Sequence, residues 1–125
     1  MHVWGIVLAA ACAGCARPHC ANQAFFGLPS PDGASIAFVF HRRCEAGTRI
    51  TTDVSVLDSR SPLRDEPGNI FSVQGEQPVR VAWLSRTSLL VTNFAEPPLE
   101  RRPRLGSIDI QYRPAAPVVA APPAP

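Results

Sequence analysis

The sequence contains no lysine, one methionine and one tyrosine among its 125 residues, and its formal net charge is only +2. So small a positive charge is too weak to predict an anionic surface as ligand, and we expect no nucleic-acid partner. The 14 prolines and eight glycines are typical of a turn-rich β protein rather than a helical one. A chain of this length is expected to form one domain.

The sequence also lacks the short motifs that mark common active sites and cofactor sites. It contains no Gly-x-Ser-x-Gly, no glycine-rich phosphate loop and no His-Glu-x-x-His. We therefore expect no cofactor and a role that is not enzymatic. The alternative is a small enzyme without a recognisable motif, for example one that combines His41, Asp53 and a serine. Such an enzyme would need a cleft that holds His41 with a carboxylate nearby.

No apolar run reaches the roughly 20 residues that are needed to cross a bilayer. Residues 3–11 form a shorter apolar run that ends in small residues and is followed by Cys12 and Cys15. This pattern is typical of a signal peptide, and small residues directly before a cysteine resemble the bacterial lipobox. We expect residues 1–14 to be a lipoprotein-type signal peptide. Cys15 is the favoured lipidation site because Ala-Gly-Cys is the commoner ending, and Cys12 is the alternative.

Lipidation would place the protein in the cell envelope, on the periplasmic or extracellular face of a membrane. A lipoprotein anchor carries more than one acyl chain, and two or more chains hold a protein firmly to a bilayer. We therefore expect the membrane to be one partner, reached through the N-terminal lipid. A second, envelope partner is expected, but the sequence does not identify it.

Cys20 and Cys44 are the two cysteines that follow the leader. In an exported protein an even number of cysteines predicts a disulfide, so we expect these two to be joined. A zinc or copper site built from His19, Cys20, His41 and Cys44 is the alternative. The spacing argues against this alternative, because side chains of adjacent residues diverge in an extended segment and His19 directly precedes Cys20.

Six segments alternate between apolar and polar residues or are short apolar runs, as strands do. They are residues 35–40, 50–57, 69–73, 79–84, 88–92 and 107–113. Short connections between about six strands predict an all-β domain, a small antiparallel meander or sandwich, over residues 30–113. Residues 15–29 are interpreted as an N-terminal tether. Residues 114–125 contain only proline, alanine and valine, with no charge and no periodic pattern. This composition predicts a disordered Pro/Ala-rich tail.

Two groups of arginines stand out, Arg42-Arg43 and Arg101-Arg102 with Arg104. They could bind an acidic partner or lipid headgroups. Most surface charges are simply solvated, so the favoured interpretation is that these arginines are exposed on loops and strand ends. A binding module would show itself instead as an exposed apolar or arginine-rimmed patch on one sheet face.

The motif Ser-Pro-Asp-Gly at 30–33, followed by an apolar strand, resembles one blade of a TolB-type β-propeller. A propeller needs at least four blades, so the resemblance implies a turn-and-strand unit and not the whole fold. A wider resemblance adds Val-Phe-His-Arg-Arg-Cys at 39–44 and Thr-Thr-Asp-Val-Ser-Val-Leu at 51–57. These motifs are similar to a family of small uncharacterised bacterial exported proteins and lipoproteins. The resemblance implies the domain and its location, and it implies no chemistry.

Overall fold

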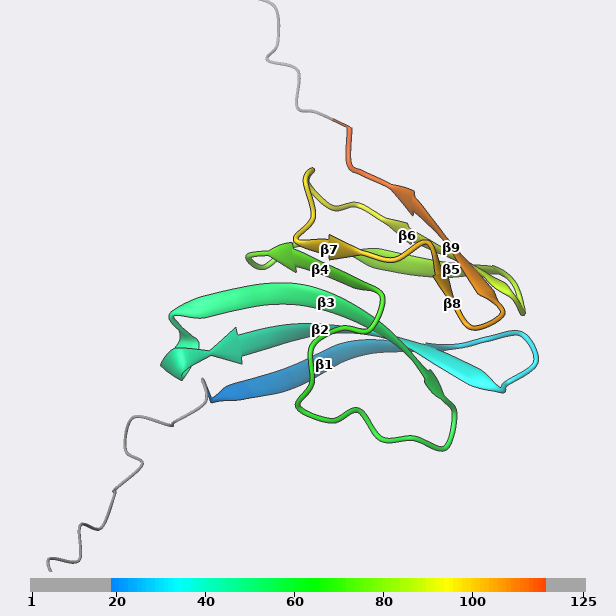
Figure 1. Cartoon of the computed structure of the whole chain (residues 1–125), viewed down its shortest axis with the longest axis horizontal. Coiled ribbons are helices and arrows are strands. Elements are labelled where there is room, and N and C mark those ends of the chain that lie inside the picture. The colour runs from blue at the N-terminus through cyan, green and yellow to red at the C-terminus, as the bar shows by residue number, and fades with distance from the viewer. Residues whose placement is uncertain (1–18, 117–125) are drawn as a thin grey trace, which may run out of the picture.

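The structure is a computed structural model that describes residues 19–116. They form two packed β-sheets, so the predicted all-β fold is confirmed (Figure 1). The first sheet has the strand order β1-β2-β3-β4-β7, and the second has the order β5-β6-β9-β8. The strands are β1 (Cys20–Pro29), β2 (Ser35–Cys44), β3 (Arg49–Asp58), β4 (Phe71–Gln74), β5 (Arg80–Ser85), β6 (Ser88–Thr92), β7 (Glu100–Arg101), β8 (Arg104–Leu105) and β9 (Ile108–Arg113).

The Ser-Pro-Asp-Gly segment forms the turn between β1 and β2. The hydroxyl of Ser30 donates a hydrogen bond of 2.6 Å to the Asp32 carboxylate, which also accepts one from the Ala34 N–H. Gly33 has a φ of +72°, a conformation that glycine adopts without steric cost. These local bonds direct β2 back along β1, and both strands are ten residues long.

The hydrophobic core lies between the two sheets. Every second residue of a strand contributes to it, because successive side chains of a strand point to opposite faces of the sheet. From the first sheet come Ala37, Val39, Val54, Val56, Phe71 and Val73, and from the second come Val81, Leu89, Val91 and Ile110. Val79, Ile70 and Phe94, from the connecting segments, complete the cluster.

The strand β1 corrects the sequence prediction that residues 15–29 are a tether. Residues 20–29 pair with β2 over its whole length, from Cys20 opposite Cys44 to Pro29 opposite Ile36. The alternation of β1 is weak because it is an edge strand with mostly exposed side chains. A β-bulge between Ala24 and Phe26 also shifts the register by one residue, which interrupts the period of two.

The predicted meander holds for β1 to β4 and for β5 with β6, which are antiparallel neighbours. The strand β9, however, pairs with β6 in parallel. The chain leaves β6, adds β7 to the first sheet beside β4, and then returns through β8 to the second sheet. Because of this excursion, β9 enters the second sheet in the same direction as β6.

The predicted signal peptide 1–14, with Cys12 and Cys15, lies outside the described residues, as does most of the predicted tail. Of residues 114–116, Ala115 is joined to the domain by a hydrogen bond from its N–H to the Phe94 carbonyl, 2.9 Å. Within residues 19–116, no helix has the length and apolar character that crossing a bilayer requires.

Candidate functional site

Cys20 and Cys44 form a disulfide, as predicted. The two residues are direct partners at the first register position of β1 and β2, with their Cα atoms 4.0 Å apart. Both sulfur atoms are therefore used, and the alternative metal site with His19 and His41 is wrong, since metal ligation requires free thiolates. Among residues 19–116, no three His, Cys, Asp or Glu side chains are grouped so that they could hold a metal ion.

His41 and Asp53 lie on opposite faces of the first sheet. His41 is paired with Thr52 and Asp53 with Phe40, so the two side chains alternate to different sides. The His41 ring lies on the inner face against Phe25, with ring centroids 4.6 Å apart, and its Nε2 has no hydrogen-bond partner within the described part of the chain. The sheet therefore separates the two side chains from which a Ser–His–Asp group would have been built.

A long connection between β3 and β4 crosses the outer face of the first sheet, the face turned away from the second sheet. We call residues 59–68 the strap; Figure 1 shows it as the green loop that passes over β1 to β3. Asn22 on β1 holds the strap with its side-chain amide, which donates to the carbonyls of Arg64, 2.8 Å, and Glu66, 2.7 Å. The Asn22 N–H donates to the Asp65 carboxylate, 3.0 Å.

Asp53 fixes the C-terminal end of the strap. Its carboxylate is 1% exposed and accepts hydrogen bonds from the Gly68 N–H, 2.8 Å, and the Ser72 hydroxyl, 2.9 Å. A buried carboxylate is tolerated only when it is hydrogen-bonded in this way. Gly68 packs so closely that a Cβ atom there would lie 2.5 Å from the Phe71 carbonyl oxygen. The strap is thus attached to the sheet at both Asn22 and Asp53.

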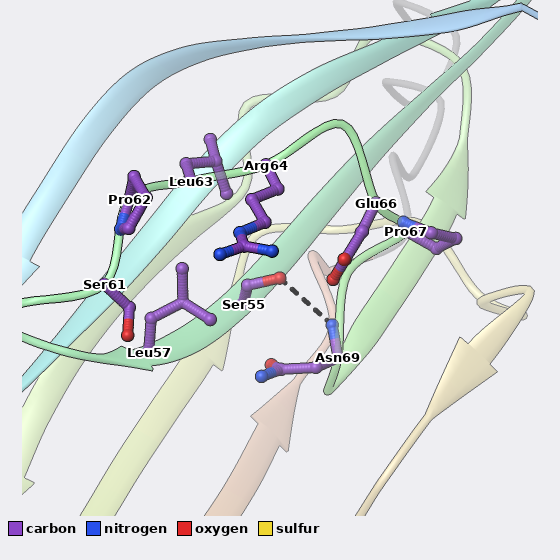
Figure 2. A pocket seen from close by; sticks show the side chains of 9 residues that line it. All are labelled: Ser55, Leu57, Ser61, Pro62, Leu63, Arg64, Glu66, Pro67 and Asn69. Carbon is purple, nitrogen blue, oxygen red and sulfur yellow. Dashed lines mark hydrogen bonds between the residues drawn. The ribbon is translucent and has the colours of Figure 1, made fainter.

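A pocket of about 260 Å³ lies between the strap and β3 (Figure 2). Leu57 on β3 and Leu63 with Pro62 on the strap supply its apolar part. The guanidinium of Arg64 extends toward Ser55, whose hydroxyl oxygen accepts a 3.0 Å hydrogen bond from the Asn69 N–H. We call this the strap pocket. Its lining combines the Arg64 guanidinium and the Glu66 carboxylate with two serine hydroxyls and an apolar surface. Its volume is slightly below the range of most ligand pockets, about 300–1,000 Å³.

A second concavity, of about 460 Å³, lies on the side of the molecule where the edge strands β1 and β5 both end their sheets. We call it the aromatic groove, and it is lined by Phe25, Phe26, Pro78, Val79, Arg80 and Val81. Phe25 and Phe26 stand at the β-bulge and are 49% and 44% exposed. Two adjacent phenylalanines with this exposure form an apolar patch of the kind that marks interaction sites.

One hydrogen bond from the strap covers part of the free edge of β1. The Asn22 N–H, near the start of the strand, donates to the Asp65 carboxylate. Edge groups that are paired in this way resist non-specific strand pairing. The Leu28 carbonyl lies on the side of β1 that faces β2, and it accepts a hydrogen bond of 2.9 Å from the Trp83 indole N–H of the second sheet.

Most arginines that the sequence analysis grouped are held in exposed ion pairs within the domain. Arg43 pairs with Glu76, Arg101 with Glu96, Arg102 with Glu100 and Arg104 with Asp109, and all of these side chains are at least 42% exposed. Exposed pairs of this kind contribute only about 0–1 kcal/mol each. Their positive charges are nonetheless offset locally, which weakens the case for an acidic partner at residues 101–104.

Comparison with protein-family models, with curated proteins and with solved structures found no match for this chain. The resemblance to exported proteins and lipoproteins therefore stays a prediction. The sequence alone predicted neither the strap pocket nor the aromatic groove. The adjacent Phe25 and Phe26 were a signal for the groove, because they are two large apolar side chains in a segment without the alternation that would bury both of them.

Proposed function

We propose that this chain is an exported envelope protein, lipid-anchored through Cys15, whose β domain is a non-enzymatic binding module. Its site is the aromatic groove, and its ligand is an extended apolar segment of a partner protein. The observation that carries the proposal is the exposure of Phe25 and Phe26 in a concave, apolar setting. Covering the exposed half of each ring would contribute on the order of 1 kcal/mol to binding.

The lining of the groove indicates the chemistry of the bound segment. Val79 and Val81 extend the apolar surface from the phenylalanines onto the start of β5. Arg80 is the charged member of the lining, and it has no carboxylate within ion-pair distance in the described residues. A peptide with two or three apolar residues and one acidic residue would complement this surface. Aromatic-lined grooves bind extended, proline-rich peptides in the same way.

A lipid bilayer is a different class of partner for exposed aromatic rings, and the shape of the site disfavours it. Rings that insert into a bilayer have to protrude, whereas Phe25 and Phe26 line a concavity together with Val79 and Val81. A concavity admits an inserted chain and excludes a flat surface. The membrane is reached in this proposal by the lipid on Cys15 and not by the aromatic groove.

Selection from a displayed peptide library against the full-length protein in non-ionic detergent tests the binding site. We expect apolar peptides with one acidic residue to be enriched, and to bind the double variant Phe25→Ser with Phe26→Ser at least tenfold more weakly, since each exposed ring half contributes about 1 kcal/mol. The control is Leu84→Ser, because Leu84 is 53% exposed on β5 but does not line the groove.

Equal binding to the wild type and the double variant would refute the groove as the site. A different result would identify the bilayer as the partner: no peptide is selected, and the double variant binds phospholipid vesicles more weakly than the wild type. The double variant and Leu84→Ser must also have the same melting temperature, so that unfolding does not explain a loss of peptide binding.

The lipid anchor is tested separately by metabolic labelling with a palmitate analogue. We expect the protein to be labelled, the Cys15→Ser variant to lose the label and the Cys12→Ser variant to keep it. An unlabelled protein that retains residues 1–14 would contradict both the anchor and the envelope location. Cys12 and Cys15 lie outside the described residues, so the leader pattern alone supports this part of the proposal.

A further inference from the structure

On the outer face of the first sheet, a third cavity lies on the other side of the strap from the strap pocket. It has a volume of about 210 Å³ and borders the Cys20–Cys44 disulfide. We call it the arginine pocket, because Arg42 and Arg49 both line it, together with Thr51, Asp53 and Ser72. The arginine pocket and the strap pocket have only Pro67 of the strap in common.

The register of β2 and β3 places the two arginines side by side. Arg42 is opposite Thr51 and Cys44 is opposite Arg49, so Arg42 and Arg49 are diagonal neighbours on the outer face. Diagonal residues in an antiparallel pair lie about 7–8 Å apart at the backbone, within reach of long side chains. Two positive side chains on one wall of a small cavity repel each other unless an anion lies between them.

In the part of the chain that the structure describes, neither guanidinium forms an ion pair with a carboxylate. Arg42 Nη1 donates instead to the neutral amide oxygen of Asn22, 2.9 Å, which orients the side chain without offsetting its charge. Within residues 19–116, the ion pairs at up to 4.0 Å involve other arginines, of which Arg43 is adjacent to Arg42 in sequence and pairs with Glu76. Asp53 shares the outer face and the pocket with Arg42, but the two side chains do not form an ion pair.

Asp53 reduces the positive charge of the pocket but does not cancel it. Two arginines and one aspartate leave a formal charge of +1 on the lining. The Asp53 carboxylate is 1% exposed and already accepts two hydrogen bonds, from Gly68 and Ser72. A bound anion would therefore contact the arginines and the Thr51 hydroxyl, which makes no side-chain hydrogen bond within the described residues.

We propose that the arginine pocket binds a phosphate group. A guanidinium presents its N–H donors in a planar fork that matches two phosphate oxygens, and two guanidinium groups with a hydroxyl match the several oxygens of one phosphate. The pocket is open to solvent, so a phosphate bound there could carry the rest of a larger ligand outside. Nothing in this inference depends on the aromatic groove.

Two sources could supply the phosphate group, a soluble phosphate compound or a phospholipid headgroup. Cys20 borders the pocket and follows Cys15 by five residues, which span at most about 17 Å when fully extended. If Cys15 is lipid-anchored, as proposed above, headgroups lie within reach. Only this second source rests on the proposed anchor; binding of soluble phosphate does not.

Isothermal titration of the full-length protein in non-ionic detergent with inorganic phosphate tests the site. Hydrogen bonds to charged groups contribute about 1.5–3 kcal/mol, so Arg49→Gln and Arg42→Gln should each weaken binding roughly tenfold or more. Arg43→Gln is the matched control, because Arg43 lies on the same strand but pairs with Glu76, and it should bind like the wild type. Arg49 is exposed and forms no ion pair within the described residues, so its substitution should not affect folding.

The absence of heat with inorganic phosphate, or equal affinity in wild type, Arg42→Gln and Arg49→Gln, would overturn the proposal. The source is then identified with the Cys12→Ser, Cys15→Ser double variant and phosphatidylglycerol vesicles. Co-sedimentation that Arg49→Gln weakens and phosphate competes away identifies a headgroup. Phosphate binding without such co-sedimentation identifies a soluble ligand. A failure of the lipid anchor would change neither the titration nor its outcome.

Discussion

The indole N–H of Trp83 donates a hydrogen bond of 2.9 Å to the backbone carbonyl of Leu28. Trp83 belongs to β5 in the second sheet and Leu28 to β1 in the first, so the bond joins the two sheets at their open edges. The Leu28 carbonyl lies on the β2 side of β1, because Leu28 and Ala37 have the same orientation as the hydrogen-bonded pair Ser30 and Ser35. The indole therefore connects the two layers from the core side, where Trp83 packs, and leaves the free edge of β1 uncovered.

Replacing Trp83 with phenylalanine removes the donor and leaves an aromatic ring in place. We expect a loss of about 1 kcal/mol in the free energy of unfolding, the usual contribution of one hydrogen bond. The midpoint of urea unfolding, with an unchanged slope, measures this loss. Leu84→Ala is a suitable control because Leu84 is exposed on the same strand. If both variants unfold at the wild-type midpoint, the bond between the sheets contributes no net stability.

The disulfide joins β1 and β2 at one end of the first sheet. With a sequence separation of 24, its removal should reduce the free energy of unfolding by about 3 kcal/mol, through the larger freedom of the unfolded chain. For a domain of this size that is a large share of the total stability. The Cys20→Ser, Cys44→Ser double variant measures the loss, because it leaves no unpaired thiol between β1 and β2. A midpoint equal to that of the wild type would show that the strand pairing alone holds β1.

The sequence predicted those parts of the fold that depend on local patterns. Residues 88–92 were predicted as a strand and form β6 with the same bounds. Val81 and Ile110 are apolar members of the alternating segments 79–84 and 107–113, and each is at most 8% exposed. The disulfide was predictable because only two cysteines follow the predicted leader, and because cysteines of exported proteins are usually oxidised outside the cytoplasm. Each of these inferences needed only alternation, composition or a count.

The parts that the sequence did not predict depend on contacts between distant residues. Polar residues such as Asp53 and Ser55 in an alternating segment are typical of a solvent-exposed face, but these two are 1% and 4% exposed because the strap covers them. Asn22 gave no signal of its own, although it holds both the strap and Arg42. The parallel pairing of β6 with β9 follows from the excursion of β7, two residues long, which no alternation can reveal.

Gly68 should tolerate no side chain. A Cβ atom there would lie 2.5 Å from the Phe71 carbonyl oxygen and 2.7 Å from that of Val54, both backbone atoms that cannot move without disturbing β3 and β4. We expect Gly68→Ala to destabilise the protein by about 1–3 kcal/mol, as overpacking does. Gly33→Asn is the control, because nothing lies within 4 Å of its Cβ position and asparagine accepts a positive φ.

Thermal unfolding of the two glycine variants measures the difference. A loss of 1 kcal/mol lowers the melting temperature of a small domain by roughly 4–8 °C, which is easily resolved. We also expect Gly68→Ala to weaken phosphate binding, because the displaced strap forms one wall of the arginine pocket at Pro67. Equal melting temperatures for Gly68→Ala and the wild type would mean that the strap can shift freely.

The single tyrosine should make the stability of the domain fall at alkaline pH. Burial raises the pKa of Tyr112 from 10.0 to about 12, although the nearby Arg101 charge acts in the opposite direction. The unfolded chain releases the proton near pH 10 and the folded chain only near 12. The contribution of Tyr112 to stability is therefore complete below about pH 10 and is lost as the pH rises toward about 12.

The sequence has no lysine, so no other side-chain amine titrates in this window. Urea midpoints across it should fall for the wild type and stay level for Tyr112→Phe, whose midpoint at neutral pH is lower because it lacks the hydroxyl. Parallel profiles for the two proteins would show that Tyr112 titrates alike in the folded and unfolded chains.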